Sequence, residues 1–254
     1  MLLRHVLPLL FAATALAADV PAASAPKLKP GEAMVLSDQD GKLSAFGDVK
    51  AEHSLGDLSQ LVWLRLAGAE WAGLDVYFVC SDPNCQPPKG HGRVDMKKAL
   101  HVDCDAAFLY WANYVREDWI RTDGEGITRM NLVSAFAPFA GDRFKGDGPV
   151  PQFGAEWIGR GDLLRTSTSG FMTWWMDAQN SEIRTRVREM IGGFFHGVLD
   201  RKTWWFKPAA SPSGTWVLGS DGHSSALLYL PFPETSDTAV DRLKALMGLP
   251  VKKK

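Results

Sequence analysis

An apolar run opens at Leu55 and reaches Leu66. Its apolar residues would fall on nearly every side of a helix, which predicts a helix buried in the core. Two polar residues in the run, Asp57 and Gln60, lie three positions apart and so share one face of that helix. Burying a carboxylate and an amide in a dry core is costly. We therefore expect this face to look into a water-filled cleft, our working hypothesis, or to contact dedicated partners.

Short runs that alternate apolar and polar residues predict strands at both ends of the chain. The first two flank Ser37-Asp38-Gln39-Asp40-Gly41, which is typical of a β-hairpin with Asp-Gly at its turn. The other three are separated by turns rich in Ser, Pro and Gly, as in an antiparallel meander. The strands are expected at residues 33–36, 42–46, 201–207, 215–219 and 224–230.

Helical patterns fill the segment between the two groups of strands. Residues 181–195 predict an amphipathic helix, and Thr235 is typical of the cap of a final helix that ends at Leu246. We expect an α/β (α+β) fold: a five-stranded antiparallel sheet with N- and C-terminal helices, plus an inserted helical subdomain over about residues 70–197. The sequence predicts one such domain over residues 31–254.

The N-terminal end has the features of an export signal. Arg4 and His5 precede an apolar core, and Ala15-Leu16-Ala17 is a small-residue cleavage site, so residues 1–17 are predicted to be a cleavable signal peptide. Residues 18–30 predict a flexible leader. The apolar stretch is too short to span a bilayer well, and no second candidate follows it. We therefore expect a periplasmic or secreted protein without a transmembrane segment in the mature chain.

The net charge of the chain adds little to these predictions. The 254 residues carry 28 basic and 29 acidic side chains, so nothing indicates a nucleic acid or an anionic membrane as a partner. No pattern indicates a cofactor.

The three cysteines are interpreted in the light of export. Cys80 and Cys85 bracket a turn-forming Ser-Asp-Pro-Asn, which favours a local disulfide in an oxidising compartment. A metal site is disfavoured because no second Cys pair or paired His lies at zinc-ligand spacing. Cys104 is interpreted as a buried thiol.

The first resemblance to a known family lies in the stretch Leu55-Gly56-Asp57-Leu58-Ser59-Gln60-Leu61. This stretch resembles the Leu-Gly-Ser-x-x-Lys-Leu segment of the serine penicillin-recognising acyltransferases, which include penicillin-binding transpeptidases and class D β-lactamases. In that family the Ser attacks a carbonyl and the Lys takes its proton. Here Asp57 and Gln60 hold those positions, and Gln cannot act as a base. Neither Ser54 nor Ser59 has a Lys three residues on, so neither resembles an activated serine.

A second resemblance spans residues 90–108. It follows the family pattern Gly-x-Gly-x-(Val/Ile)-x-(Leu/Met)-x-x-Ala-Leu-x-x-Ser-Cys-Asn-x-x-Phe, whose Ser and Asn project into the active site. Asp103 and Asp105 stand where that Ser and Asn are expected, and Cys104 keeps the middle place. The resemblance therefore implies a site with two further carboxylates.

A third resemblance is Lys202-Thr203-Trp204, which stands where the family has Lys-Thr-Gly on the strand that lines the cleft. Trp204 in place of Gly would crowd a substrate backbone. Lys207-Pro208-Ala209 is a second possible register, ranked lower. The chain is also similar to uncharacterised exported penicillin-binding-like domains found near bacterial α2-macroglobulin genes.

Together the resemblances imply that Asp57, Asp103 and Asp105 converge near Lys202. Like charges at about 4 Å repel by roughly 1 to 4 kcal/mol, so one carboxylate should have a raised pKa or recruit a cation. The structural alternative is that Asp57 only caps its helix, in a Ser54-x-x-Asp57 capping signature.

These replacements argue against enzymatic activity. The sequence favours a catalytically inactive relative that serves as a periplasmic binding or scaffolding domain, with an unknown envelope protein or peptide ligand. The alternative is a hydrolase or acyltransferase with a non-standard acidic site, in which Asp57 is the nucleophile or base, or Asp57, Asp103 and Asp105 hold a divalent metal.

Overall fold

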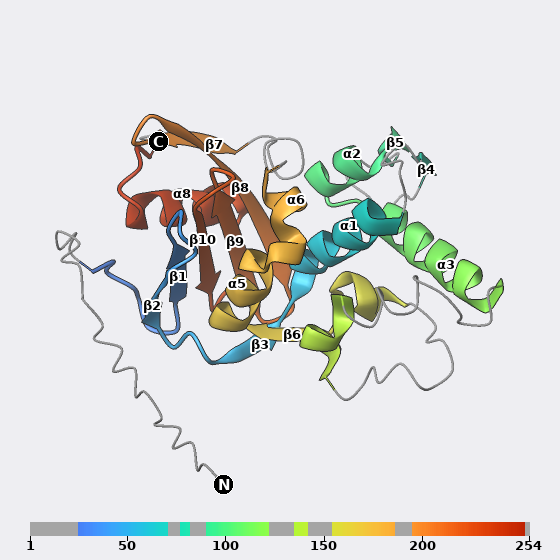
Figure 1. Ribbon diagram of the computed structural model, residues 1–254, viewed down its shortest axis with the longest axis horizontal. Helices are drawn as coiled ribbons and strands as arrows, with labels where there is room; N and C mark the ends of the chain where they lie inside the picture. The colour runs from blue at the N-terminus through green and yellow to red at the C-terminus, as the bar shows by residue number, and fades with distance from the viewer. Residues whose placement is uncertain are drawn as a thin grey trace, which may run out of the picture.

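The computed structural model describes residues 25–70, 77–81, 90–121, 135–141, 154–185 and 195–251 (Figure 1). The predicted signal peptide lies outside these residues, and so does Cys85. None of the helices in the described ranges is long and apolar enough to cross a membrane.

One antiparallel sheet of six strands organises the chain, in the order β2-β1-β10-β9-β8-β7. Five of its strands were predicted, and the sixth, β7, lies where the sequence indicated the end of the helical subdomain. A tight turn at Asp200 and Arg201, both with positive φ, folds β7 back onto β8. The strands are β1 (Ala33–Ser37), β2 (Leu43–Gly47), β7 (His196–Leu199), β8 (Lys202–Ser211), β9 (Gly214–Ser220) and β10 (Ser225–Leu230).

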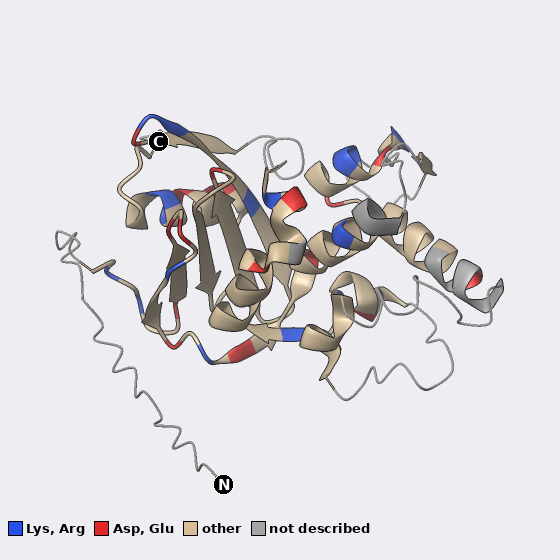
Figure 2. Cartoon of the chain, in the orientation of Figure 1, with Lys and Arg blue, Asp and Glu red and all other residues tan. Residues whose placement is uncertain are grey.

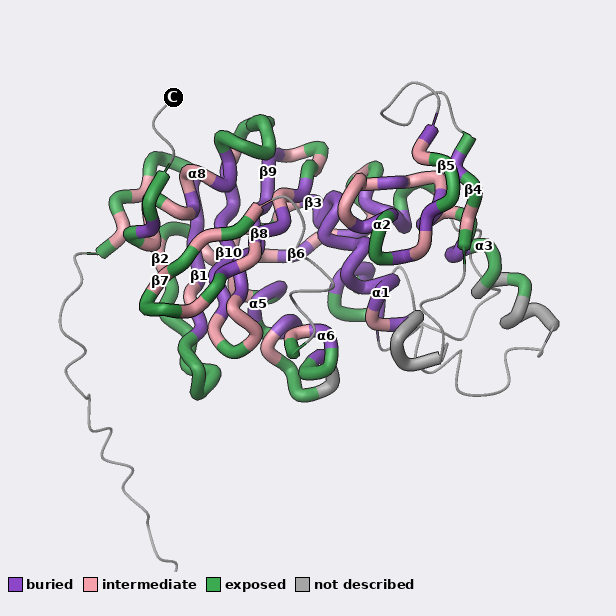
Figure 3. Tube along the Cα trace, turned by 90° about the horizontal axis from the view of Figure 1, so that it is seen from above, coloured by how far each residue is buried: buried purple, intermediate pink, exposed green. Residues whose placement is uncertain are grey.

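The centre of the sheet is covered on both faces. Every residue of β9 and β10 is buried, whereas the edge strand β7 alternates between exposed and half-buried residues (Figure 3). Helix α8 (Ser236–Leu246), capped by Thr235 as predicted, packs on one face against β8 and β9. Helix α5 (Thr168–Met176) packs on the other face, against β1 and β10. The predicted N-terminal helix is not found among residues 25–32, the described residues that precede β1.

Helices α1 (Ser59–Glu70), α2 (Met96–His101) and α3 (Asp105–Arg121) lie to one side of the sheet (Figure 1). Two small antiparallel sheets pair β3 (Glu52–Ser54) with β6 (Arg165–Ser167), and β4 (Phe78–Cys80) with β5 (Gly92–Val94). The second of them is a hairpin, because β4 and β5 are consecutive strands. The short helical turns are η1 (Gly56–Leu58), η3 (Ala155–Ile158), η4 (Ala178–Asn180) and α6 (Ser181–Thr185), the last being the described part of the predicted helix 181–195.

The central apolar run behaves as its pattern predicts. Its residues from Leu55 to Leu64 are at most 2% exposed. The run begins as the turn η1, and the regular helix α1 starts at Ser59. The predicted capping by Ser54 is not found, because its hydroxyl donates to the carbonyl of Gly161 instead. Trp216 of β9 donates its indole N–H to the carbonyl of Ser54 at 2.9 Å, which ties this end of the run to the sheet.

No disulfide is found among the described residues, and Cys85, the predicted partner of Cys80, lies outside them. Cys80 is a buried thiol, and so is Cys104, as the sequence indicated. Cys80 ends β4, and its sulfur lies near the donor atoms of His91 and Cys104 rather than in an exposed turn.

Candidate functional site

Asp57 lies on η1, between α1 and the strand β8. Its side chain is only 3% exposed. One carboxylate oxygen, Oδ2, accepts a hydrogen bond from the backbone N–H of Ala210 at 3.1 Å. Asp57 therefore contacts a dedicated partner, whereas Gln60 on the same face is fully buried without a hydrogen-bond partner among the described residues. This corrects the working hypothesis that the face looks into a water-filled cleft.

Glycine at position 56 makes this contact possible. Gly56 has φ +57°, and a Cβ there would lie 2.1 Å from the carbonyl oxygen of Ala210. Only a residue without a side chain lets η1 approach β8 so closely. The Leu-Gly-Asp sequence thus places the carboxylate directly against the strand backbone.

Arg160 joins two of the predicted aspartates. Its Nε donates to Oδ2 of Asp105 at 2.6 Å, and its Nη2 lies 3.4 Å from Oδ1 of Asp57. Gly159, with φ +91°, packs against the backbone of Gly56 and brings the following arginine to this position. Arg160 was not among the residues predicted for the site from the sequence. The Gly159-Arg160-Gly161 triplet was the available signal, because glycines on both sides of a cation are typical of a tightly turned backbone.

Lys207, not Lys202, is the lysine that lies with the aspartates. Its Nζ contacts Oδ1 of Asp103 at 2.8 Å and donates to the carbonyl of Leu100 at 3.0 Å. Its side chain is 5% exposed. The lower-ranked register, Lys207-Pro208-Ala209, is therefore the one that meets the cluster.

The Lys202 triplet lies elsewhere on β8. Lys202 is at the start of the strand, where its Nζ is 3.5 Å from Oδ2 of Asp221. Thr203 is exposed. Trp204 packs in the core with residues of α8, so its indole does not crowd the aspartates as expected. The reason is the strand's alternation, which sends Trp204 and Lys207 to opposite faces.

The charges shift the protonation of Asp57. Burial and the neighbouring carboxylates of Asp103 and Asp105 raise its pKa to about 7, against the opposing effects of Arg160 and Lys207. The expectation that one of the carboxylates carries a raised pKa is thus met by Asp57. Elsewhere the acidic and basic residues are scattered along the described chain (Figure 2). The site is a cluster of three carboxylates and two cations, and the charges of Asp103, Asp105, Arg160 and Lys207 all act on Asp57.

Gln60 and Ser59 have no role in this network. Both are fully buried, and neither the Gln60 amide nor the Ser59 hydroxyl has a hydrogen-bond partner within the described part of the chain. Neither side chain forms a hydrogen bond with Asp57 in the described part of the chain, so neither is placed to exchange a proton with it. Among the described residues of the site, no serine therefore lies next to a base.

The edge of β8 that faces away from β9 offers few donors. The N–H of Phe206 donates to the carbonyl of Phe195 at 3.0 Å, and the N–H of Ala210 donates to Asp57. Between them, Pro208 has no N–H at all. A peptide that added to this edge as a further strand would lack these three backbone donors.

The three aspartates do not form the oxygen-rich metal site considered in the sequence analysis. In the described ranges, they are not a group whose donor atoms lie within 4.8 Å of one another. Asp103 is engaged by Lys207 and Asp105 by Arg160, so the cations in this cluster are side chains of the chain itself.

Comparison with solved structures shows which fold this is. The class D β-lactamase from Bacillus subtilis has 12% sequence identity and a TM-score of 0.57, over 88% of this chain and 93% of that chain. The class D β-lactamase FUS-1 from Fusobacterium nucleatum subsp. polymorphum has 12% identity and a TM-score of 0.53, over 85% and 89%. The class D β-lactamase YbXI from Nostoc has 11% identity and a TM-score of 0.53, over 86% and 94%.

These similarities confirm the predicted β-lactamase-like architecture, with six strands in the sheet instead of five. No family model and no curated protein sequence matches the chain. At such low identity the comparison establishes the fold alone, so function has to be argued from the site.

Proposed function

We propose that this chain, which has the fold of class D β-lactamases, is an exported domain that does not form acyl-enzymes and that serves in binding or scaffolding. One observation carries the proposal: the carboxylate of Asp57 is held against the backbone N–H of Ala210 at 3.1 Å. By the sequence resemblance, Asp57 stands where the family has its nucleophilic serine. Here that position holds an acceptor already engaged with the strand.

The described residues of the site do not supply the groups that serine acylation needs. Acyl transfer needs a nucleophile next to a base and free backbone donors for the oxyanion. Gln60 replaces the lysine base of the resemblance and has no proton-accepting nitrogen. Ser59 is fully buried, and Ser54 donates to a backbone carbonyl. The N–H of Ala210 is occupied by Asp57.

The cations of the site are also engaged. Lys207 pairs with Asp103, and Arg160 pairs with Asp105 and Asp57. A ligand carboxylate, such as that of a β-lactam or a cell-wall peptide terminus, would have to displace one of these internal partners. The site therefore disfavours anionic ligands, and the partner we propose is an envelope protein or peptide held without a covalent bond. Export to the periplasm or the medium rests on the signal-like residues 1–17.

A second candidate function follows from the pKa of Asp57. A carboxyl group with a pKa of about 7 is suited to take up and release protons at neutral pH. In this alternative the chain is a hydrolase in which Asp57 activates water. It ranks below the binding domain because Asp57 is almost entirely shielded from solvent.

Hydrolysis of a chromogenic cephalosporin separates the two candidates. We expect the full chain to show no turnover above the rate in buffer, with a class D β-lactamase as positive control. Asp57→Asn and Gln60→Glu variants should behave like the wild type. Turnover that Asp57→Asn abolishes would overturn the binding domain and establish the hydrolase; turnover that survives this substitution would contradict both candidates.

A further inference from the structure

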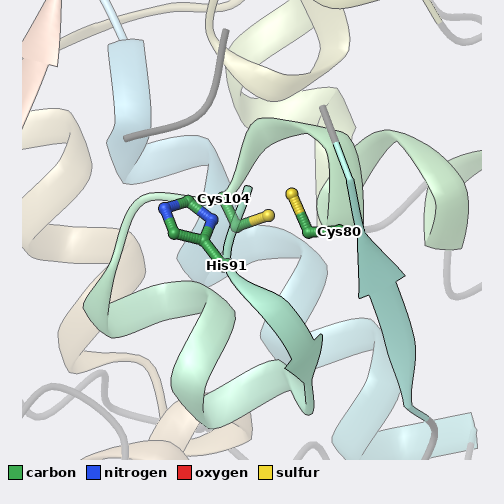
Figure 4. Close-up of side chains that lie close together, drawn as sticks. All are labelled: Cys80, His91 and Cys104. Atoms are coloured by element: carbon green, nitrogen blue, oxygen red, sulfur yellow. The ribbon is translucent and has the colours of Figure 1, made fainter. Parts of the chain in front are cut away.

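A second cluster of chemically reactive side chains lies apart from the aspartates. The sulfur atoms of Cys80 and Cys104 and a ring nitrogen of His91 all lie within 4.8 Å of one another. Figure 4 shows the two sulfurs pointing toward each other, with the imidazole ring beside the sulfur of Cys104. In the described ranges, this is the group of His, Cys, Asp or Glu residues that meets the spacing of a metal site.

The three donors come from three separate segments. Cys80 is the last residue of β4, His91 directly precedes β5, and Cys104 directly precedes α3. The hairpin register pairs Cys80 with Gly92, so His91 lies next to the end of β4. No short Cys or His spacing in the sequence marks the site, and this explains why sequence analysis disfavoured a metal.

The backbone holds His91 in place. Gly90 has φ +76°, and a Cβ there would lie 2.4 Å from the carbonyl oxygen of Cys80, so the chain passes directly against β4. The Nζ of Lys98 donates to the carbonyls of His91 at 3.2 Å and Arg93 at 3.1 Å. The ring is thus presented to the sulfurs by a fixed loop.

An independent observation points to a missing ligand. Both ring nitrogens of His91 are buried, and neither has a hydrogen-bond partner in the part of the chain that the structure describes. Buried polar atoms are normally satisfied by a protein group, water or a bound ion. A metal ion bound by the two sulfurs would also be coordinated by one ring nitrogen of His91, which would then have a partner.

We propose that Cys80, His91 and Cys104 bind a zinc ion. Two thiolates and a neutral imidazole match the ligand types of zinc, and two thiolates balance its charge of +2, which suits a buried site. Zn–S bonds of about 2.3 Å and Zn–N bonds of about 2.0 Å require donor atoms roughly 3.4–3.8 Å apart, so a small contraction of the cluster closes the site. The fourth position would hold water, and binding would release the two thiol protons.

A bound zinc ion would restrain the segment that carries two carboxylates of the neighbouring acidic cluster. Cys104 lies between Asp103, which pairs with Lys207, and Asp105, which pairs with Arg160. Binding would therefore fix the segment that carries both carboxylates and attach it to the β4–β5 hairpin. This inference rests on the Cys and His residues and does not depend on the proposed function.

Zinc uptake by the full chain tests the proposal. The protein is treated with chelator and a non-thiol reductant, given one equivalent of Zn²⁺, desalted and analysed for bound metal. We expect about one zinc per chain, and more than about 100-fold weaker binding for Cys104→Ser and His91→Ala. The exposed His196→Ala is the matched control and should bind as the wild type does, and so should Cys85→Ser.

Cobalt provides a readout that does not depend on the variants folding. Co²⁺ bound by the wild type should show a thiolate-to-cobalt charge-transfer band that one equivalent of Zn²⁺ removes. No zinc bound by the reduced wild type would overturn the proposal, as would a Co²⁺ spectrum without this band. Loss of zinc from Cys85→Ser would overturn the three-residue ligand set, and an unchanged affinity in folded Cys104→Ser would do the same.

Discussion

The Asp57→Asn variant is expected to be more stable than the wild type above pH 7, by on the order of 4 kcal/mol. The carboxyl of Asp57 has a pKa of about 7 in the folded chain against an ordinary value of 3.8. Each unit of that difference corresponds to about 1.4 kcal/mol between the two protonation states. Asn has the same shape, stays neutral and can still accept the N–H of Ala210, so it removes the cost of ionising a buried group.

The change of folding stability with pH follows from the number of protons that the folded and the unfolded chain bind. Between pH 3.8 and 7 the folded chain keeps a proton on Asp57 that the unfolded chain has released. The stabilisation from this raised pKa is therefore complete below about pH 3.8 and is lost as the pH rises through 7. Burial is the largest cause of this raised pKa, and the charges of Asp103, Arg160, Lys207 and Asp105 modify it in that order.

Urea denaturation of both proteins from pH 4 to pH 8.5 measures the effect. The difference in the free energy of unfolding should be small at pH 4 and should grow toward pH 8. The exposed Asp40→Asn is the matched control and should show no such trend. A variant that is less stable than the wild type at pH 8 would show that ionised Asp57 is stabilised by its cations and that its pKa is not raised.

The second large effect is expected for Asp103→Asn, which should cost about 2–3 kcal/mol of folding stability. Its partner Lys207 is 5% exposed, so removing the carboxylate leaves a buried ammonium without a counter-charge. The cost stays below that of a fully buried pair because Asp103 itself is 40% exposed. Asp103 has φ +47°, a conformation that Asn also tolerates, so backbone strain does not contribute.

Asp105→Asn is the matched control, two residues along the chain. Its partner Arg160 is 42% exposed and remains solvated when the carboxylate is lost, so the cost should stay within about 1 kcal/mol. Urea denaturation at pH 6, where Asp57 keeps its proton, compares the two variants. Equal costs would contradict the burial argument. Asp103→Asn should also lower the pKa of Asp57, because it removes a neighbouring negative charge.

Local pattern was sufficient to predict much of this fold. The alternation of apolar residues gave five of the strands, and Thr235 gave the start of α8. The three family resemblances implied that Asp57, Asp103 and Asp105 converge. In the structure the charges of Asp103 and Asp105 both act on Asp57. Strand β7 was missed because it lies next to an amphipathic pattern typical of a helix.

The partners of the aspartates depend on long-range packing that no local pattern encodes. Lys202 and Lys207 both lie on β8, and alternation alone does not tell which of them meets η1 and α2. Arg160 comes from a turn about a hundred residues beyond Asp57 and reaches it only because two glycine-containing turns pack together. The cysteine and histidine cluster likewise forms only when the β4–β5 hairpin packs beside α3.

The most direct test of the proposed function is the mass of the intact protein after incubation with benzylpenicillin, with a class D β-lactamase as positive control. The binding of Asp57 to the N–H of Ala210, together with the absence of a serine beside a base, predicts an unchanged mass at every time point. A stable increase equal to the mass of the penicillin would show that the chain has an active nucleophile. That result would contradict the proposal that the domain does not form acyl-enzymes.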